Sequence, residues 1–78
     1  MDEMYWKILE TINLFSGSSG IYIAPDKVRD KIGIPEGKYF ERINDLEKMG
    51  FLKIVGGGGA KLTLDGSIAL QNKKNLEV

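Results

Sequence analysis

The side chains of this sequence that are best suited to chemistry are two cations and an amide between residues 37 and 45. Lys38, Arg42 and Asn44 follow one another at spacings of four and two residues. Lysine and arginine can contact phosphates or the acceptor atoms of guanine, and asparagine can pair with adenine. This combination indicates recognition of a nucleic acid by charge and hydrogen bonding.

The chain contains neither cysteine nor histidine. This composition excludes disulfides and thiol chemistry, and it removes the commonest zinc ligands and the usual general base. The four glycines at 56–59 lie between two expected strands, so they form a turn and not a phosphate loop that opens a helix. We therefore expect a binding module that needs no cofactor and no metal, and an enzyme is the least favoured alternative.

A length of 78 residues is sufficient for one domain, which we assign to 1–78 with a core at about 3–70 and a C-terminal tail at about 71–78. No apolar run approaches the ~20 residues that a membrane span needs. The acidic start of the chain lacks the basic region of a signal peptide. These features predict a cytoplasmic protein with no membrane partner.

The net charge is zero, with 11 basic and 11 acidic residues, which argues against strong non-specific binding to DNA. The charges are unevenly distributed, however. Residues 27–61 hold eight basic side chains against five acidic ones. The acidic surplus lies in the expected N-terminal helix, which we place away from the basic segment.

Hydrophobic periodicity predicts the elements that would position these side chains. In residues 3–15 an apolar stripe ending at Phe15 indicates a helix, and the β-branched segment 21–24 indicates a short strand. Proline at a helix start and glycine at a helix end delimit helices at 25–32 and 35–49. Strands at 51–55 and 60–62 flank the glycines, and Thr63 caps a last helix whose apolar side is Leu64, Ile68 and Ala69. The expected class is α+β, in the order helix–strand–helix–helix–strand–strand–helix with a small antiparallel sheet.

Two sequence segments carry a resemblance to a known family. Leu46-Glu47-Lys48-Met49-Gly50-Phe51-Leu52 ends the third expected helix, and Leu62-Thr63-Leu64-Asp65-Gly66 follows the hairpin. With the order of elements, these segments resemble the winged helix-turn-helix domains of small regulators of the MarR, ArsR and PadR groups. The resemblance implies sequence-specific binding of double-stranded DNA in transcription regulation. The resemblance also implies that helix 35–49 is the recognition helix and that hairpin 51–62 is the wing.

The residues expected to contact DNA lie on the exposed sides of these elements. In the expected recognition helix, Glu41 and Asp45 repel phosphates, and only a cytosine amino group offers an acidic side chain a favourable base contact. The alternative is a solvated helix surface held by charge pairs at spacings of three and four residues. The predicted DNA contacts are Lys27, Gly37, Lys38, Glu41, Arg42, Asn44, Lys53 and Lys61.

Trp6 and Leu14 lie off the apolar stripe of the first helix, so they indicate a second contact surface. Either the C-terminal segment covers them, since Leu70, Leu76 and Val78 are also unassigned, or they form a twofold interface. We favour the homodimer, because it doubles the contacts that a small regulator makes with DNA.

The alternative function is an adaptor that binds another protein through the same architecture. Zero net charge and the acidic residues of helix 35–49 favour this hypothesis. The distinguishing feature is whether Lys38, Arg42, Lys53 and Lys61 form one continuous positive surface.

Overall fold

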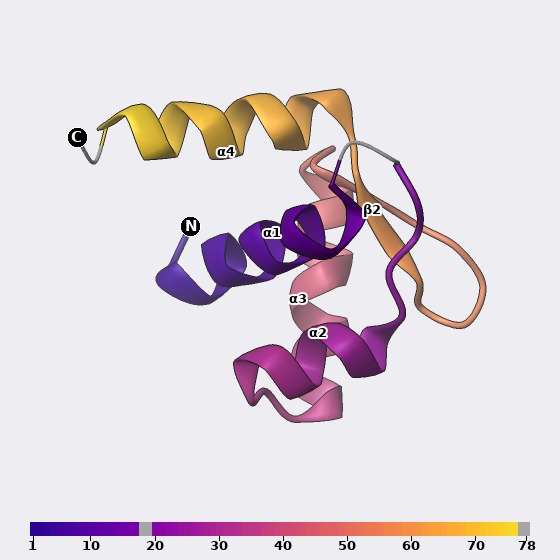
Figure 1. The fold of residues 1–78 in the computed structure, drawn as a ribbon. Coiled ribbons are helices and arrows are strands. Elements are labelled where there is room, and N and C mark those ends of the chain that lie inside the picture. Colours follow the sequence, from indigo (N-terminus) through magenta and orange to yellow (C-terminus); the bar gives the residue numbers. More distant parts are fainter. Residues whose placement is uncertain (18–19, 77–78) are drawn as a thin grey trace.

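The computed structural model describes residues 1–17 and 20–76. Within these ranges the chain forms four helices and one two-stranded antiparallel sheet, so the predicted α+β class is confirmed. None of the helices in these ranges is long and apolar enough to cross a lipid bilayer. Figure 1 shows the elements, which in chain order are α1 (Glu3–Ser16), α2 (Pro25–Ile32), α3 (Glu36–Lys48), β1 (Leu52–Ile54), β2 (Ala60–Leu62) and α4 (Leu64–Leu76).

Helix α1 supplies one wall of the core. The Asp2 side chain caps its start by accepting from the backbone N–H of Met4, and its buried stripe is formed by Ile8, Leu9 and Ile12. The expectation that Phe15 completes this stripe is wrong, because Phe15 is 39% exposed. The helix turns Ser16 rather than Phe15 toward the interior, so the buried side continues to the end of α1 but its apolar part ends at Ile12.

Helices α2 and α3 are joined by a tight turn at residues 33–35. Pro25 begins α2, and Gly33 ends it with a φ of 81°, a left-handed conformation that glycine adopts readily. Pro35 precedes α3 as its N-cap residue, and the apolar stripe of Tyr39, Ile43 and Leu46 is buried as predicted. This stripe fixes which side of α3 faces solvent.

The hairpin pairs Leu52 with Leu62 and Ile54 with Ala60. The predicted strand at 21–24 is reduced to a single bridge, in which the backbones of Ile23 and Ala60 exchange two hydrogen bonds of 2.8 and 3.1 Å. A longer strand does not form because Ala24 is already the N-cap residue of α2 and Pro25 has no N–H to donate. The bridge still ties the start of α2 to the sheet.

Helix α4 begins as predicted, with the Thr63 hydroxyl accepting from the Gly66 N–H at 3.0 Å. The expectation that Leu64 and Ile68 form its buried apolar side is wrong, because they are 77% and 49% exposed. Leu70 is buried instead. The reason is a close approach at Gly66, where a Cβ would lie 2.1 Å from the Phe51 carbonyl oxygen. Gly66 and Leu70, one turn apart, therefore face the domain.

The segment expected as a tail from residue 71 is helical as far as Leu76, and residues 77–78 lie outside the described residues. Lys73 accounts for part of this order. Its ammonium group lies 3.8 Å from a Glu3 carboxylate oxygen and 5.5 Å from the centre of the Trp6 ring. These contacts hold the C-terminal half of α4 against α1.

Candidate functional site

The outward side of α3 is an exposed stripe that lies opposite Tyr39, Ile43 and Leu46. Helical geometry places its members at spacings of three or four residues, so they form one continuous surface. All of its residues are exposed, and we call this surface the α3 outer face: Gly37, Lys38, Glu41, Asn44 and Lys48. It carries two cations, one amide and one carboxylate, and the structure thus brings together Gly37, Lys38, Glu41 and Asn44 of the predicted contacts.

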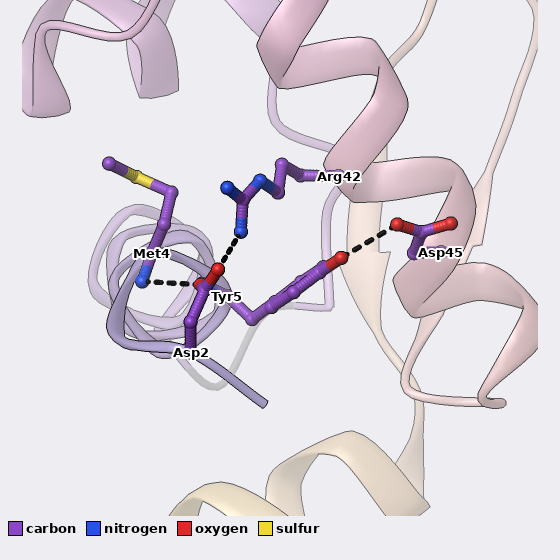
Figure 2. A network of polar contacts seen from close by, with 5 residues as sticks. All are labelled: Asp2, Met4, Tyr5, Arg42 and Asp45. Carbon is purple, nitrogen blue, oxygen red and sulfur yellow. Dashed lines mark hydrogen bonds and ion pairs between the residues drawn. The ribbon is translucent and has the colours of Figure 1, made fainter.

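Arg42 is not part of the α3 outer face. Its side chain is only 26% exposed and turns toward the beginning of α1, where its Nη1 atom binds the Asp2 carboxylate (Figure 2). The guanidinium carbon also lies 4.7 Å from the centre of the Tyr5 ring, which is a cation–π contact. Arg42 is therefore bound within the chain, in contrast to its expected place among the exposed contacts.

The Asp2–Arg42 pair changes the proton affinities of both groups. The hydrogen bond from Arg42 is the main cause that lowers the pKa of Asp2, and the same bond raises the pKa of Arg42. Each group is stabilised in its charged form by the other. The acidic start of α1 consequently acts directly on α3, which corrects the expectation that these charges lie away from the basic segment.

Tyr5 connects the same two helices through its hydroxyl group. The Tyr5 hydroxyl donates to the Asp45 Oδ2 atom at 2.7 Å, and this bond is the main cause that raises the pKa of Tyr5 (Figure 2). The Asp45 carboxylate is therefore bonded to a residue of α1, and it lies on the flank of α3 and not on the α3 outer face. Sequence reasoning missed Asp2 and Tyr5. Asp2 was detectable as a helix cap, but its partner 40 residues away was not.

The two predicted hairpin lysines lie directly opposite each other. The register pairs Lys53 with Lys61, and directly paired residues in an antiparallel ladder project from the same side of the sheet. The ammonium group of Lys61 lies 4.9 Å from the centre of the Tyr22 ring. Tyr22, which sequence reasoning did not single out, thus holds one member of a like-charged pair.

The hairpin packs along one flank of α3, on the side away from Arg42. The Glu47 Oε2 atom accepts from the Ile54 N–H at 3.0 Å, which joins α3 to β1. At the turn, a Cβ on Gly58 would lie 2.6 Å from the Phe40 ring and 2.9 Å from Pro25, so the tip is seated closely on α2 and α3. The α3 outer face and the hairpin therefore have a fixed relative placement.

The four cations that distinguish DNA binding from adaptor binding do not form one continuous positive surface. Arg42 is neutralised by Asp2 on one flank of α3. Glu41 lies within the α3 outer face, and the Glu47 carboxylate stands between α3 and the hairpin. The positive charge is divided into the lysines of the α3 outer face and the Lys53–Lys61 pair.

Helix α2 presents Lys27 to solvent in its first turn. Its other charges near α3 are paired, since Arg29 lies 3.6 Å from Asp26 and 3.9 Å from Glu36. Lys27 is therefore exposed at the same end of the α2–α3 unit as the hairpin tip, which contacts Pro25.

The two residues assigned to a dimer interface differ in their surroundings. Trp6 is half-buried, packs against the core and is covered on its ring by Lys73, which agrees with the alternative that the C-terminal segment covers it. Leu14 is 65% exposed. Of the other unassigned C-terminal residues, Leu70 is buried, Leu76 is 86% exposed, and Val78 lies outside the described residues.

Comparison of the chain with family models, with curated proteins and with solved structures gives no match.

Proposed function

We propose that this protein is a winged helix-turn-helix module that binds double-stranded DNA and acts as a small transcription regulator. In this proposal α3 is the recognition helix and the hairpin is the wing. The observation that carries it is the α3 outer face, which presents Lys38, Asn44 and Lys48 on one exposed side of the helix, with Gly37 on the same side near the helix start. Lysines there would contact phosphates, and Asn44 would read adenine in the major groove.

The wing adds a phosphate contact to the proposed interface. Lys53 and Lys61 project from one side of the hairpin, and the contact of Lys61 with Tyr22 limits the freedom of its side chain. A cation that is already ordered loses less conformational entropy when it binds. Because the charges are few and divided, we expect modest affinity that falls as salt rises, with a slope set by the small number of phosphate contacts.

We also propose that the regulator binds as a homodimer. The support is the exposure of Leu14 on the outside of α1, together with the doubling of DNA contacts that a twofold axis gives. Trp6 would contribute less than the sequence predicted, because Lys73 covers part of its ring.

A protein-binding adaptor is the second candidate function. It is favoured by one specific observation, the interruption of the positive surface by the Asp2–Arg42 pair and by Glu41. In that case the α3 outer face would bind a partner whose charges complement two lysines and one glutamate.

An NMR titration of labelled protein with a mixed-sequence duplex at low salt tests the two candidates. DNA binding predicts shifts at residues 37–48 and at Lys53 and Lys61 that fade as salt is added. Lys38→Ala should weaken binding and reduce the salt slope by about 1. Lys7→Ala is the matched control, because Lys7 is an exposed lysine of α1. The absence of shifts at low salt would remove the DNA proposal and leave the adaptor ahead.

A further inference from the structure

Arg42 is held in place by α1 before any ligand arrives. The guanidinium lies over the Tyr5 ring at 4.7 Å, and the Tyr5 hydroxyl is itself fixed by its 2.7 Å bond to Asp45. Arginine presents donors in a planar fork that matches the oxygens of a carboxylate or a phosphate. The structure therefore contains an ordered oxyanion-binding group on the flank of α3, and the oxyanion bound there is the carboxylate of Asp2 (Figure 2).

The Asp2–Arg42 pair is open to competition. The Asp2 side chain is 56% exposed, and the contact uses one guanidinium nitrogen, Nη1. Ion pairs that remain in contact with solvent are modest in strength and are weakened by salt. A polyanion that approaches α3 can thus exchange with Asp2 without unfolding the domain.

The position of Arg42 relative to the α3 outer face favours a nucleic-acid phosphate as that competitor. Arg42 lies one helical turn from Lys38, at the spacing of four residues that makes helix side chains neighbours. A phosphate backbone that contacts Lys38 would pass close to this flank. The acidic groups that act on Arg42 are Asp2, which caps α1, and Glu41 of α3, whereas Asp45 is bonded to the Tyr5 hydroxyl.

We infer that Asp2 occupies a phosphate-binding position on Arg42, and that the backbone of a DNA duplex displaces it. This inference rests on the proposed function, and it adds that Asp2 competes with the DNA phosphate for Arg42. The chain's own N-terminal carboxylate lowers DNA affinity by binding the arginine that would otherwise contact a phosphate.

Asp2→Asn is the variant that tests the inference. Asparagine caps a helix about as well as aspartate, so α1 keeps its cap and loses only the charge that binds Arg42. Glu3→Gln is the matched control, because it changes the net charge equally in the first turn of α1, where Glu3 is paired with Lys73. The double variant Asp2→Asn with Arg42→Gln shows whether a gain requires Arg42.

The measurement is an NMR titration of each protein with a mixed-sequence duplex, following the Arg42 side-chain Nε–Hε signal and the amides of α3. We expect Asp2→Asn to bind the duplex several-fold more tightly at low salt, with the Arg42 signal shifting. Because the duplex displaces Asp2 in the wild type as well, Arg42 contacts the same phosphate in both proteins, so the gain should appear in affinity with a nearly unchanged salt slope. Glu3→Gln should give a smaller gain in affinity, and the double variant should lose the gain of Asp2→Asn.

Three other results would each overturn the inference in a different way. Shifts at Lys38 and Lys48 with a stationary Arg42 in Asp2→Asn would retain DNA binding and reject the competition. No shifts in any variant at low salt would reject DNA binding, and with it the competitor. An equal Arg42 response to inorganic phosphate at the same phosphate concentration would assign the position to a free anion and not to a nucleic acid.

Discussion

Asp2 and Arg42 join the beginning of α1 to the middle of α3, although the two residues are 40 positions apart in the sequence. The same carboxylate accepts from the Met4 N–H at 3.0 Å and so also caps α1. The Asp2 side chain thus both caps the start of α1 and pairs with the guanidinium of Arg42 in α3. This double role leads to a prediction for stability.

The stability of the domain should depend on the charge of Asp2 at acidic pH. The bond with Arg42 lowers the pKa of Asp2 below its ordinary value of 3.8. A depressed pKa in the folded state gives stability that is present above the unfolded pKa and lost as pH falls through the folded value. Between about pH 5 and about pH 2 the Tm of the wild type should fall further than that of Asp2→Asn. Equal losses would show that the pair does not stabilise the fold.

The buried Tyr39 hydroxyl should be dispensable. It has no hydrogen-bond partner among residues 1–17 and 20–76, and burial raises its pKa to about 12. Tyr39→Phe should leave the free energy of unfolding unchanged or raise it by up to about 1 kcal/mol, measured by urea denaturation. Tyr5→Phe is the contrast, because its hydroxyl is bonded to Asp45, and it should destabilise the domain. A clear loss in Tyr39→Phe would reveal a partner for that hydroxyl.

Tyr39 should also make the wild type sensitive to alkali. Between pH 10 and about 12 the unfolded chain ionises this phenol while the folded chain keeps it neutral. The raised folded pKa gives stability that is intact below pH 10 and is lost above it, at about 1.4 kcal/mol per pH unit. Urea denaturation across this range should show the loss in the wild type and a smaller loss in Tyr39→Phe.

Gly66→Ala should be among the most damaging small substitutions. Its Cβ would lie 2.1 Å from the Phe51 carbonyl oxygen, so α4 or the segment before β1 must move. We expect a loss of about 1–3 kcal/mol in the free energy of unfolding, as for overpacked sites. Gly56→Ala is the matched control, because a Cβ there meets nothing within 4 Å. A tolerated Gly66→Ala would contradict the close approach of α4 to Phe51.

Helix α4 should be anchored by Leu70 and not by Ile68. Leu70 is 3% exposed and Ile68 is 49% exposed. Leu70→Ala should lower the free energy of unfolding by about 2–5 kcal/mol, the range for a buried leucine. Ile68→Ala should remain within about 0.5 kcal/mol of the wild type. The reverse order in chemical denaturation would place the sequence-predicted side of α4 against the core.

The amino-acid sequence by itself determined where the four helices lie and where α2 begins and ends. Proline and glycine act on the backbone of their own segment, so Pro25 and Gly33 delimit α2 correctly. The stripe of Tyr39, Ile43 and Leu46 likewise specified the buried side of α3, and with it the position of the α3 outer face. These are local properties, decided within a few residues along the chain.

Only the tertiary structure decided the features that depend on distant neighbours. The side of α4 that faces the domain follows from the approach of Gly66 to Phe51, and the single bridge of Ile23 follows from its meeting with Ala60. Arg42 is not among the exposed residues of α3 because α1 packs against α3 and brings Asp2 and Tyr5 to the Arg42 guanidinium. Periodicity specifies the sides of a helix, whereas the packing of the helices specifies which charges on those sides meet.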